Sequence, residues 1–242
     1  MGLQQYSEFK QTLEKYHISQ RANDVIADLK LVLLIAPTSG GRNTIIRKQV
    51  ESGRYYYIVS DTTRAPRKND GVMEQNGKEY WFRTEPEVLA DLKAGEYLEA
   101  ELIHDQQVSG ISIRELETAK TQNKIAITDV DLEGVHNVIK AKADTIVIMI
   151  LPPSFDEWQR RLAGRGRMRD DEQRRRFETA QKIFKDGLKQ DYYHFVISEN
   201  IEQSASIIDA IVDGKSNPHQ GRAPGLIQHM EERLQEKLAS AF

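Results

Sequence analysis

Two arginines lie three positions apart in a polar segment that is rich in turn-forming residues. Arg64 and Arg67 have Pro66 between them, and each planar guanidinium presents a fork of N–H donors that matches the oxygens of a phosphate group. The proline stiffens the backbone between the two forks. These residue types could form a clamp for a phosphate dianion, although an arginine pair in a loop is usually only solvated.

A glycine-bearing segment, residues 36–44 (APTSGGRNT), stands between an apolar run and a helical pattern. A phosphate-binding loop needs glycine where backbone N–H groups turn toward the anion, a lysine for the outer phosphates and a hydroxyl for magnesium. Gly41 fits this requirement. Ala36, Arg42 and Asn43 replace the usual glycine, lysine and serine or threonine. The match is weak by itself, and an ordinary turn between strand and helix explains the segment equally well.

The elements that would position these residues alternate along the chain. Apolar runs predict strands at residues 30–36, 55–59, 97–103, 124–130, 145–151 and 195–197. Helical spacing predicts helices at residues 43–52, 85–94, 112–122, 132–142, 155–162, 170–189 and 201–212. Residues 61–79 are polar and predict a hairpin-like insertion. The alternation of strands and helices is typical of a parallel sheet covered by helices.

Both ends of the chain extend beyond this alternation. Residues 1–29 predict a helical extension with a break near Ser19. Residues 214–225 contain prolines and glycines and predict a linker. In residues 226–242 leucine or methionine recurs every four positions, which predicts an amphipathic helix. Docking of this helix onto the chain's own core is the favoured interpretation, and a homodimer or partner contact through the terminal helices is the alternative.

Composition limits the classes of function. The 242 residues are 39% hydrophobic and 29% charged, with a net charge of −3, so any recognition of phosphate must come from local arginine clusters. The chain has no cysteine, which excludes disulfides, thiolate metal sites and cysteine nucleophiles. No stretch resembles a signal peptide or a membrane span. We therefore expect a cytoplasmic protein that binds neither nucleic acid nor membranes.

Several motifs follow one another along the chain, namely SDTTRAPR (60–67), NGKEYWF (76–82), EYLE (96–99), TDVDLEGV (128–135), LPPS (151–154), RLAGRG (161–166) and Arg176. In order and spacing they resemble the motifs of the guanylate kinase family. The resemblance covers about residues 31–212. It implies a three-layer α/β/α P-loop kinase core with a parallel sheet in residues 30–213. A mixed α/β GMP-binding insertion would occupy about residues 61–113, and a helical lid about residues 155–190.

The resemblance implies an acceptor site for GMP. Ser60 and Tyr80 would add hydroxyl donors to the arginine clamp. Glu99 and Asp129 would accept hydrogen bonds from the N1 and N2 donors of guanine, which adenine does not offer at that edge. Ser109 stands in a segment, Val-Ser-Gly-Ile, where the family usually shows Tyr-Tyr-Gly-Ser or Thr. The implied GMP-binding residues are Ser60, Arg64, Arg67, Tyr80, Glu99, Ser109 and Asp129.

The resemblance also implies a donor site for ATP, with a degenerate Walker A loop. Lid arginines would close over the triphosphate and neutralise the charge that develops during in-line transfer. The implied catalytic residues are Arg42, Asp131, Arg161, Arg165 and Arg176. The implied ATP-binding residues are Ser39, Gly40, Gly41, Arg42, Asn43, Thr44, Arg161 and Arg165. Asn43 and Asp131 are the implied, weak ligands for Mg²⁺, because the usual hydroxyl is missing.

These patterns favour a guanylate kinase that uses ATP as co-substrate and converts GMP to GDP, with activity reduced by the altered loop. Arg42 keeps a positive charge but lacks the compact ammonium of lysine. A non-catalytic module that binds a nucleotide or a phosphorylated partner through the arginine clamp is the alternative. A nucleoside monophosphate kinase with another acceptor is a third hypothesis, which Glu99 and Asp129 disfavour.

Overall fold

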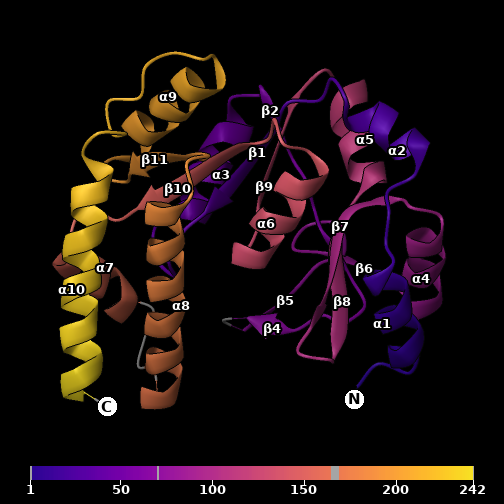
Figure 1. Cartoon of the computed structure of the whole chain (residues 1–242), viewed down its shortest axis with the longest axis horizontal. Helices are drawn as coiled ribbons and strands as arrows, with labels where there is room; N and C mark the ends of the chain where they lie inside the picture. The colour runs from indigo at the N-terminus through magenta and orange to yellow at the C-terminus, as the bar shows by residue number, and fades with distance from the viewer. Residues whose placement is uncertain (1, 70, 165–168, 242) are drawn as a thin grey trace. The chain divides into compact units, whose positions relative to one another are not determined.

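The computed structural model describes residues 2–69, 71–164 and 169–241 (Figure 1). The chain forms two compact units. The first unit comprises Met1–Leu31, Arg54–Thr128 and Glu133–Thr145. The second unit comprises Val32–Gly53, Asp129–Leu132 and Ile146–Phe242.

The main sheet is parallel, with the strand order β11-β10-β1-β9-β2. β1 (Leu31–Ile35) pairs with β10 (Ile146–Leu151), and β10 pairs with β11 (Tyr193–Ile197). β9 (Ile125–Asp129) pairs in the same direction with β2 (Tyr55–Tyr57). All of β1 and nearly all of β10 is buried, because a parallel strand is covered on both faces. The predicted α/β fold with a parallel sheet is confirmed.

Two groups of helices complete the second unit. α3 (Arg42–Glu51) packs against α9 (Ile201–Val212), and the side-chain amide of Gln49 donates to the carbonyl of Ala205 at 2.9 Å. The other group consists of α7 (Phe155–Ala163), α8 (Asp170–Lys189) and α10 (Ala223–Ala241). In this group the ring of Trp158 lies 5.8 Å from Phe155, 5.7 Å from Phe177 and 6.2 Å from Phe184. An aromatic cluster therefore joins α7 to α8.

The C-terminal helix α10 docks onto α7, α8 and β11 of its own unit. Its apolar face is buried, with Ile227, Met230 and Leu234 fully covered. The favoured interpretation of this helix is thus confirmed, and its packing gives no support to a dimer contact. The helix begins at Ala223, inside the segment expected to be a linker, because proline is tolerated in a first helical turn and Pro224 lies there.

The segment before α10 is also more ordered than its composition predicts. Its side chains hydrogen-bond the edge strand β11. Asn217 donates to the Phe195 carbonyl at 3.0 Å, and the backbone N–H of Ile197 donates to Nδ1 of His219 at 2.9 Å. Gln220 donates to the Tyr193 carbonyl at 2.9 Å. These bonds satisfy backbone groups that an uncovered edge strand would leave unpaired.

The first unit contains a second sheet, with the strand order β6-β3-β8-β7. Its strands are β3 (Asp61–Thr62), β6 (Trp81–Phe82), β7 (Tyr97–Ile103) and β8 (Gln107–Ser112). The expected hairpin in residues 61–79 is present as β4 (Lys68–Asn69) paired with β5 (Val72–Met73). β8 was not predicted, because its sequence QVSGIS shows neither an apolar run nor a regular alternation.

Helices accompany these strands in the described part of the first unit. They are α1 (Tyr6–Glu14), α2 (Gln20–Ile26), α4 (Glu85–Lys93), α5 (Ile113–Thr121) and α6 (Leu132–Ala141). The N-terminal extension (residues 1–29) packs into the first unit, since α1 contacts α4 and β7 while α2 contacts α5. Phe9 is fully buried in a cluster with Leu89, Leu92 and Tyr97. The predicted break near Ser19 is confirmed, because its side chain accepts from the N–H of Ala22 and begins α2.

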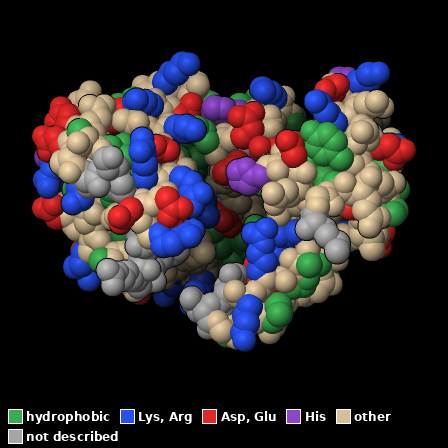
Figure 2. All heavy atoms as spheres, turned by 90° about the horizontal axis from the view of Figure 1, so that it is seen from below, with side chains coloured by type: hydrophobic (Ala, Val, Ile, Leu, Met, Phe, Trp, Pro, Cys, Tyr) green, Lys and Arg blue, Asp and Glu red, His purple; other side chains and the backbone are tan. Residues whose placement is uncertain are grey.

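Exposed charges of both signs lie close to one another on one face of the molecule (Figure 2). Figure 2 shows basic and acidic side chains interspersed on the face that it presents, with hydrophobic side chains in small areas. Within residues 2–69, 71–164 and 169–241, no helix combines the length and apolar character that crossing a membrane requires.

Candidate nucleotide site

The phosphate loop (residues 36–41) follows β1 in the second unit and turns tightly into α3. Gly41 has a φ of 102° and precedes the helix without any side-chain cap, while Ser39 has a φ of 65°. The Gly40 N–H donates to the Pro37 carbonyl at 2.8 Å, and a Cβ at Gly40 would lie only 2.9 Å from that oxygen. An uncapped helix N-terminus after a glycine turn presents backbone N–H groups and a positive dipole end to an anion.

Side chains of α7 and of the segment after β11 hold this loop. The indole N–H of Trp158 donates to the Thr38 carbonyl at 2.7 Å, and the Ser198 hydroxyl donates to the Gly40 carbonyl at 2.9 Å. Arg161 in turn donates to the hydroxyl and to the carbonyl of Ser198, each at 2.9 Å. The structure therefore brings the predicted lid residue Arg161 to the phosphate loop, with Ser198 as the link.

A pocket of about 580 Å³ opens beside the loop. Its lining includes Ser39, Gly41, Thr44, Glu157, Arg161 and Ser198. Hydrogen bonds from Arg160 and Arg161 lower the pKa of Glu157 to about 2, so this carboxylate stays ionised and keeps Arg161 in place. The pocket has the size of a small-molecule site and carries the polar groups of four of the predicted ATP-binding residues.

Arg42 lies with Asp129, although the sequence had placed these two residues in different halves of the site. Its guanidinium is 2.6 Å from the Asp129 carboxylate and donates to the Val130 carbonyl at 3.3 Å. Both side chains are partly buried, with 27% and 22% of their surfaces exposed. The charge that replaces the usual lysine is thus engaged at the end of β9.

Oxygen donors suitable for magnesium are present but do not form a preassembled cluster. Within residues 2–69, 71–164 and 169–241, no group of three or more His, Asp or Glu could hold a metal ion. Asn43 is exposed on the first turn of α3, and Asp131 is exposed just before α6. Mg²⁺ in kinase sites takes one or two protein oxygens and completes its shell with substrate phosphates and water. The donor atoms of these two residues fit that requirement.

Arg165 and Arg176 are the remaining predicted lid arginines. Arg165 lies outside the described residues. Arg176 pairs with Glu172 at 2.5 Å through one nitrogen, while its other terminal nitrogen is buried without a hydrogen-bond partner among the described residues. The hydroxyl of Ser39 is likewise buried without such a partner. Both atoms therefore keep hydrogen-bonding capacity that a ligand could use.

In the first unit, Glu74 holds the arginine clamp. Its carboxylate accepts two bonds from the Arg64 guanidinium, at 2.5 and 2.9 Å, and one from the N–H of Arg67 at 2.8 Å. The Arg64 guanidinium also lies over the Tyr80 ring, 4.8 Å from its centroid. The hydrogen bonds that Arg64 donates to Glu74 raise the pKa of Arg64. Three of the predicted GMP-binding residues are thus assembled around one carboxylate that the sequence did not single out.

Two further predicted residues join the clamp through hydrogen bonds and strand pairing. Arg67 donates to Gln107 at 3.3 Å, and the Gln107 amide donates to the Ser109 hydroxyl at 3.4 Å. Ser60 and Tyr80 immediately precede Asp61 and Trp81, which are partners in the β3–β6 pairing. Adjacent strands therefore place the two hydroxyl residues side by side.

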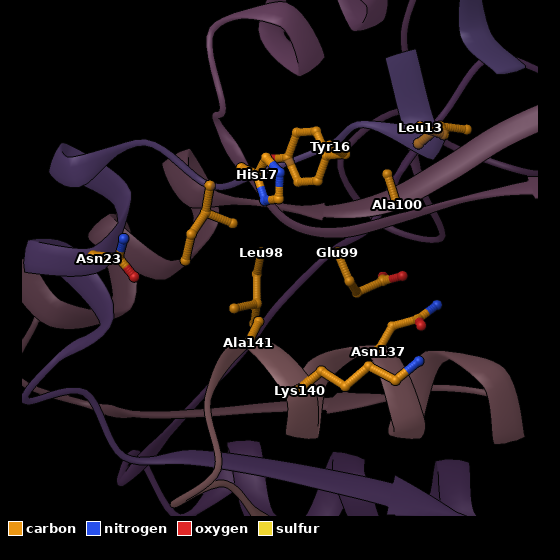
Figure 3. A pocket seen from close by; sticks show the side chains of 11 residues that line it. Leu13, Tyr16, His17, Asn23, Leu98, Glu99, Ala100, Asn137, Lys140 and Ala141 are labelled. Carbon is orange, nitrogen blue, oxygen red and sulfur yellow. The ribbon is translucent and has the colours of Figure 1, made fainter. Parts of the chain in front are cut away.

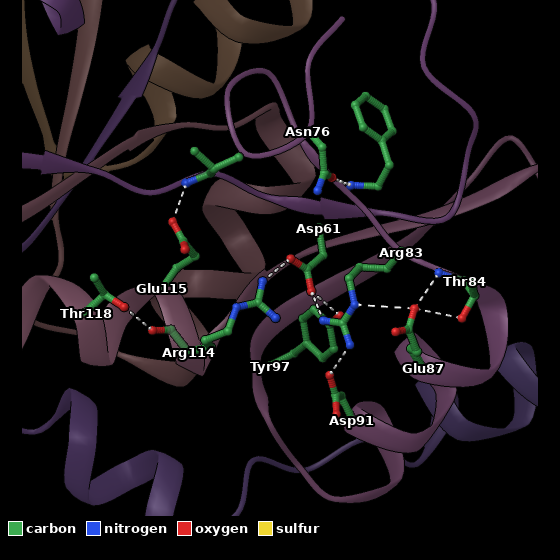
Figure 4. Close-up of polar contacts among 12 residues, drawn as sticks. Asp61, Asn76, Arg83, Thr84, Glu87, Asp91, Tyr97, Arg114, Glu115 and Thr118 are labelled. Carbon is green, nitrogen blue, oxygen red and sulfur yellow. Dashed lines mark hydrogen bonds and ion pairs between the residues drawn. The ribbon is translucent and has the colours of Figure 1, made fainter.

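A buried carboxylate fixes the base of this arrangement (Figure 4). Asp61 is 1% exposed and accepts bonds from Arg83 at 3.1 Å, Arg114 at 2.7 Å and the Tyr97 hydroxyl at 2.7 Å. Burial and the nearby Asp61 raise the pKa of Tyr97, so its hydroxyl remains a donor. The network ties β3 to β7 and α5. This network was not predicted, because nothing in the SDTTRAPR motif distinguishes Asp61 from its neighbours.

Residues 28–214 match the sequence model described as guanylate kinase. The chain is 32% identical over 188 residues to the guanylate kinase of Bifidobacterium longum, covering 76% of this chain and 93% of that one. It is 33% identical over 190 residues to that of Corynebacterium diphtheriae, with 77% and 95% covered. The chain belongs to the guanylate kinase family.

A solved structure supports the same assignment. The guanylate kinase from Anaplasma phagocytophilum matches with a TM-score of 0.55 and 27% identity, over 77% of this chain and 85% of that one. The predicted guanylate kinase resemblance and kinase fold are confirmed. Residues 1–27 and 215–242 lie outside the guanylate kinase match, although the structure packs both ends onto the units that carry the site residues.

Proposed function

We propose that this chain is a guanylate kinase that transfers the γ-phosphoryl group of ATP to GMP and releases ADP and GDP. The observation that carries the proposal is the arginine clamp, preformed by Glu74 beside Tyr80 in a chain of this family. A fork of guanidinium donors that is held in place before binding loses little conformational entropy when phosphate arrives.

Acceptor binding follows from the clamp and its neighbours. Arg64 and Arg67 would bind the phosphate of GMP, with the hydroxyls of Ser60 and Tyr80 as further donors. Glu99 and Asp129 would accept from the N1 and N2 donors of guanine. Adenine offers no matching donors at that edge, so AMP would lack the hydrogen bonds that these carboxylates accept from guanine.

Donor binding relies on the phosphate loop and on arginines rather than on a lysine. The N–H groups at the start of α3 would bind phosphate oxygens, and Arg161 and the unpaired nitrogen of Arg176 would neutralise charge on the transferring group. Arg165 would act with them. When bound, Mg²⁺ would shield the phosphate charges, held by Asn43 and Asp131. Phosphoryl transfer needs little more than such positioning and charge.

The altered loop would lower the rate. Arg42 already pairs with Asp129 and Val130, so its charge is directed to the end of β9 rather than to the phosphates. Asn43 supplies an amide oxygen where a hydroxyl is usual. We therefore propose activity with a smaller kcat than a loop with lysine and serine would give.

A coupled assay of ADP release with GMP, AMP and dTMP as acceptors tests the proposal. We expect turnover with GMP that exceeds turnover with AMP by at least about a hundred-fold, as base-edge hydrogen bonding allows. Arg64→Ala removes one arginine of the clamp and should lower this turnover, and Arg47→Ala, an exposed change on α3, is its matched control. Absence of GMP-dependent turnover at high enzyme concentration would contradict the kinase. GMP binding without turnover would instead support the non-catalytic module.

A further inference from the structure

A pocket in the first unit is lined in part by the N-terminal extension. It measures about 670 Å³, and three elements contribute to its wall. In the view of Figure 3, Glu99 of β7 lies between Tyr16 and His17 of the extension and Asn137 and Lys140 of α6. The extension lies outside the guanylate kinase match, which begins at residue 28. A proposed guanine-binding carboxylate therefore shares a pocket with residues that lie outside the guanylate kinase match.

Tyr16 holds the strand that carries this carboxylate. The N–H of Tyr97 donates to the Tyr16 hydroxyl at 2.8 Å, and that hydroxyl donates to the Tyr97 carbonyl at 2.5 Å. β7 is an edge strand of its sheet, so these backbone groups have no neighbouring strand on that side. One hydroxyl thus replaces a neighbouring strand at this position. The side chain of Tyr97 is fixed in turn by Asp61.

The residues just before β7 are bound to the extension as well. The Ser19 N–H donates to the Gly95 carbonyl at 3.0 Å, and a Cβ at Gly95 would lie 2.6 Å from that nitrogen. Arg21 bridges Glu96 at 2.5 Å and Glu117 at 2.6 Å. These ion pairs are exposed and contribute little free energy, but together with the backbone contact they define where β7 begins.

The pairing of β7 is irregular between Tyr97 and Glu99. Such irregularities re-aim the side chains that follow them. Glu99 comes two residues after the backbone that Tyr16 binds, at the end of this irregularity. Burial raises the pKa of Tyr16 to about 12, and the charges of Glu96 and Glu99 add to this, so its hydroxyl stays protonated and able to donate.

We propose that the N-terminal extension is part of acceptor recognition and that Tyr16 is the residue that positions Glu99 for a purine monophosphate with an exocyclic 2-amino group. This inference rests on the function proposed above. Glu99 needs a fixed orientation to accept from the 2-amino group of such a base. Loss of that orientation weakens the binding of a base with two donors more than the binding of a base with one donor.

The experiment compares GMP with IMP, which lacks the 2-amino group, by calorimetry on the full chain without ATP. In Tyr16→Phe we expect the Kd of GMP to rise about ten-fold and that of IMP by less than about three-fold, so discrimination between them falls. Tyr6→Phe is the matched control. It removes a hydroxyl of the same extension that donates to Asp105 at 3.1 Å, and both constants should stay unchanged.

A lower Tm in Tyr16→Phe with an unchanged ratio of GMP to IMP affinity would overturn the inference, since the extension would then only stabilise the fold. If Tyr16→Phe does not fold, Arg21→Gln carries the test, with a smaller fall of the ratio expected and an unchanged ratio contradicting the inference. A parent chain that binds no GMP would defeat the proposed function along with this inference. If the parent binds GMP and the variants keep its ratio of GMP to IMP affinity, this inference alone fails.

Discussion

Single carboxylates decide the geometry of the site residues. Glu74 is 6% exposed and Arg64 11% exposed, so their ion pair is largely shielded from solvent. Removing one partner of such a pair leaves the other charge uncompensated. The arginine clamp therefore depends on a residue that contacts the arginines rather than, in our proposal, the nucleotide.

Glu74→Gln tests this dependence. The amide keeps one acceptor but loses the charge, so we expect GMP affinity to fall about ten-fold because Arg64 is no longer held in place. Guanosine has no phosphate and should bind with unchanged affinity. Calorimetry with both ligands measures the difference. Glu79→Gln, which affects an acceptor of the Gln75 N–H in the same segment, is the control. Equal GMP affinity in parent and Glu74→Gln would show that the clamp forms without the carboxylate.

The pairing of Arg42 with Asp129 leads to a second prediction. In the double variant Arg42→Lys, Asn43→Ser, a compact ammonium and a hydroxyl stand at the start of α3, directly after the phosphate loop. We expect kcat at saturating ATP and GMP to rise about ten-fold, a modest share of what one charged donor contributes in a transition state. Arg47→Lys, an exposed change on the same helix, controls for the loss of a guanidinium. An unchanged kcat would mean that other groups compensate for the altered loop.

At the scale of elements, short segments outside the regular strands cover the edges of the sheets. Asn217, His219 and Gln220 bind the backbone of β11, and Tyr16 binds that of β7. Of these side chains, His219 titrates closest to neutrality. Its Nδ1 accepts from the backbone N–H of Ile197. Only a neutral ring with Nδ1 unprotonated can accept this hydrogen bond.

The pH dependence of stability follows from this bond. Burial, with the charge of Arg222, lowers the pKa of His219 below 6.5. The folded state thus takes up the proton less readily than the unfolded chain, so the stabilisation is complete above 6.5 and is lost as pH falls through the lower folded value. Between about pH 7.5 and 5.5 we expect the Tm of the parent to fall at least about 2 °C more than that of His219→Asn.

Thermal unfolding of three proteins measures this effect. His229→Asn, an exposed change on α10, should keep the pH dependence of the parent. His194, whose pKa is also lowered by burial, is present in all three proteins and cancels in the comparison. The same slope of Tm against pH in parent and His219→Asn would exclude a role for the neutral ring.

At the scale of the whole molecule, the sequence predicted the elements with strong periodicity and the residues with strong motifs. The strands β1 and β10 are continuous apolar runs, and the arginine clamp lies in a motif of the family. Contacts between distant segments were not predictable. Glu74 acts seven positions from Arg67, and Tyr16 reaches a strand that begins at Tyr97. Neither pairing leaves a periodic signal in the sequence.

The same limit explains the terminal segments. Proline and glycine in residues 214–225 predicted a linker, yet the polar residues between them hydrogen-bond β11. Composition reports how freely a backbone can turn and not which partner its side chains meet. Polar side chains opposite an edge strand are recognised only once the strand order is known.

The covered strand edges have a consequence for shortened forms of the protein. A chain trimmed to residues 28–214 would keep the whole guanylate kinase match but lose Tyr16 and the 217–220 segment. Unpaired N–H and C=O groups would then line β7 and β11, and open edges of this kind recruit strands from other molecules. Trimming to the family boundaries would therefore favour self-association. The terminal residues would prevent aggregation by covering these strand edges.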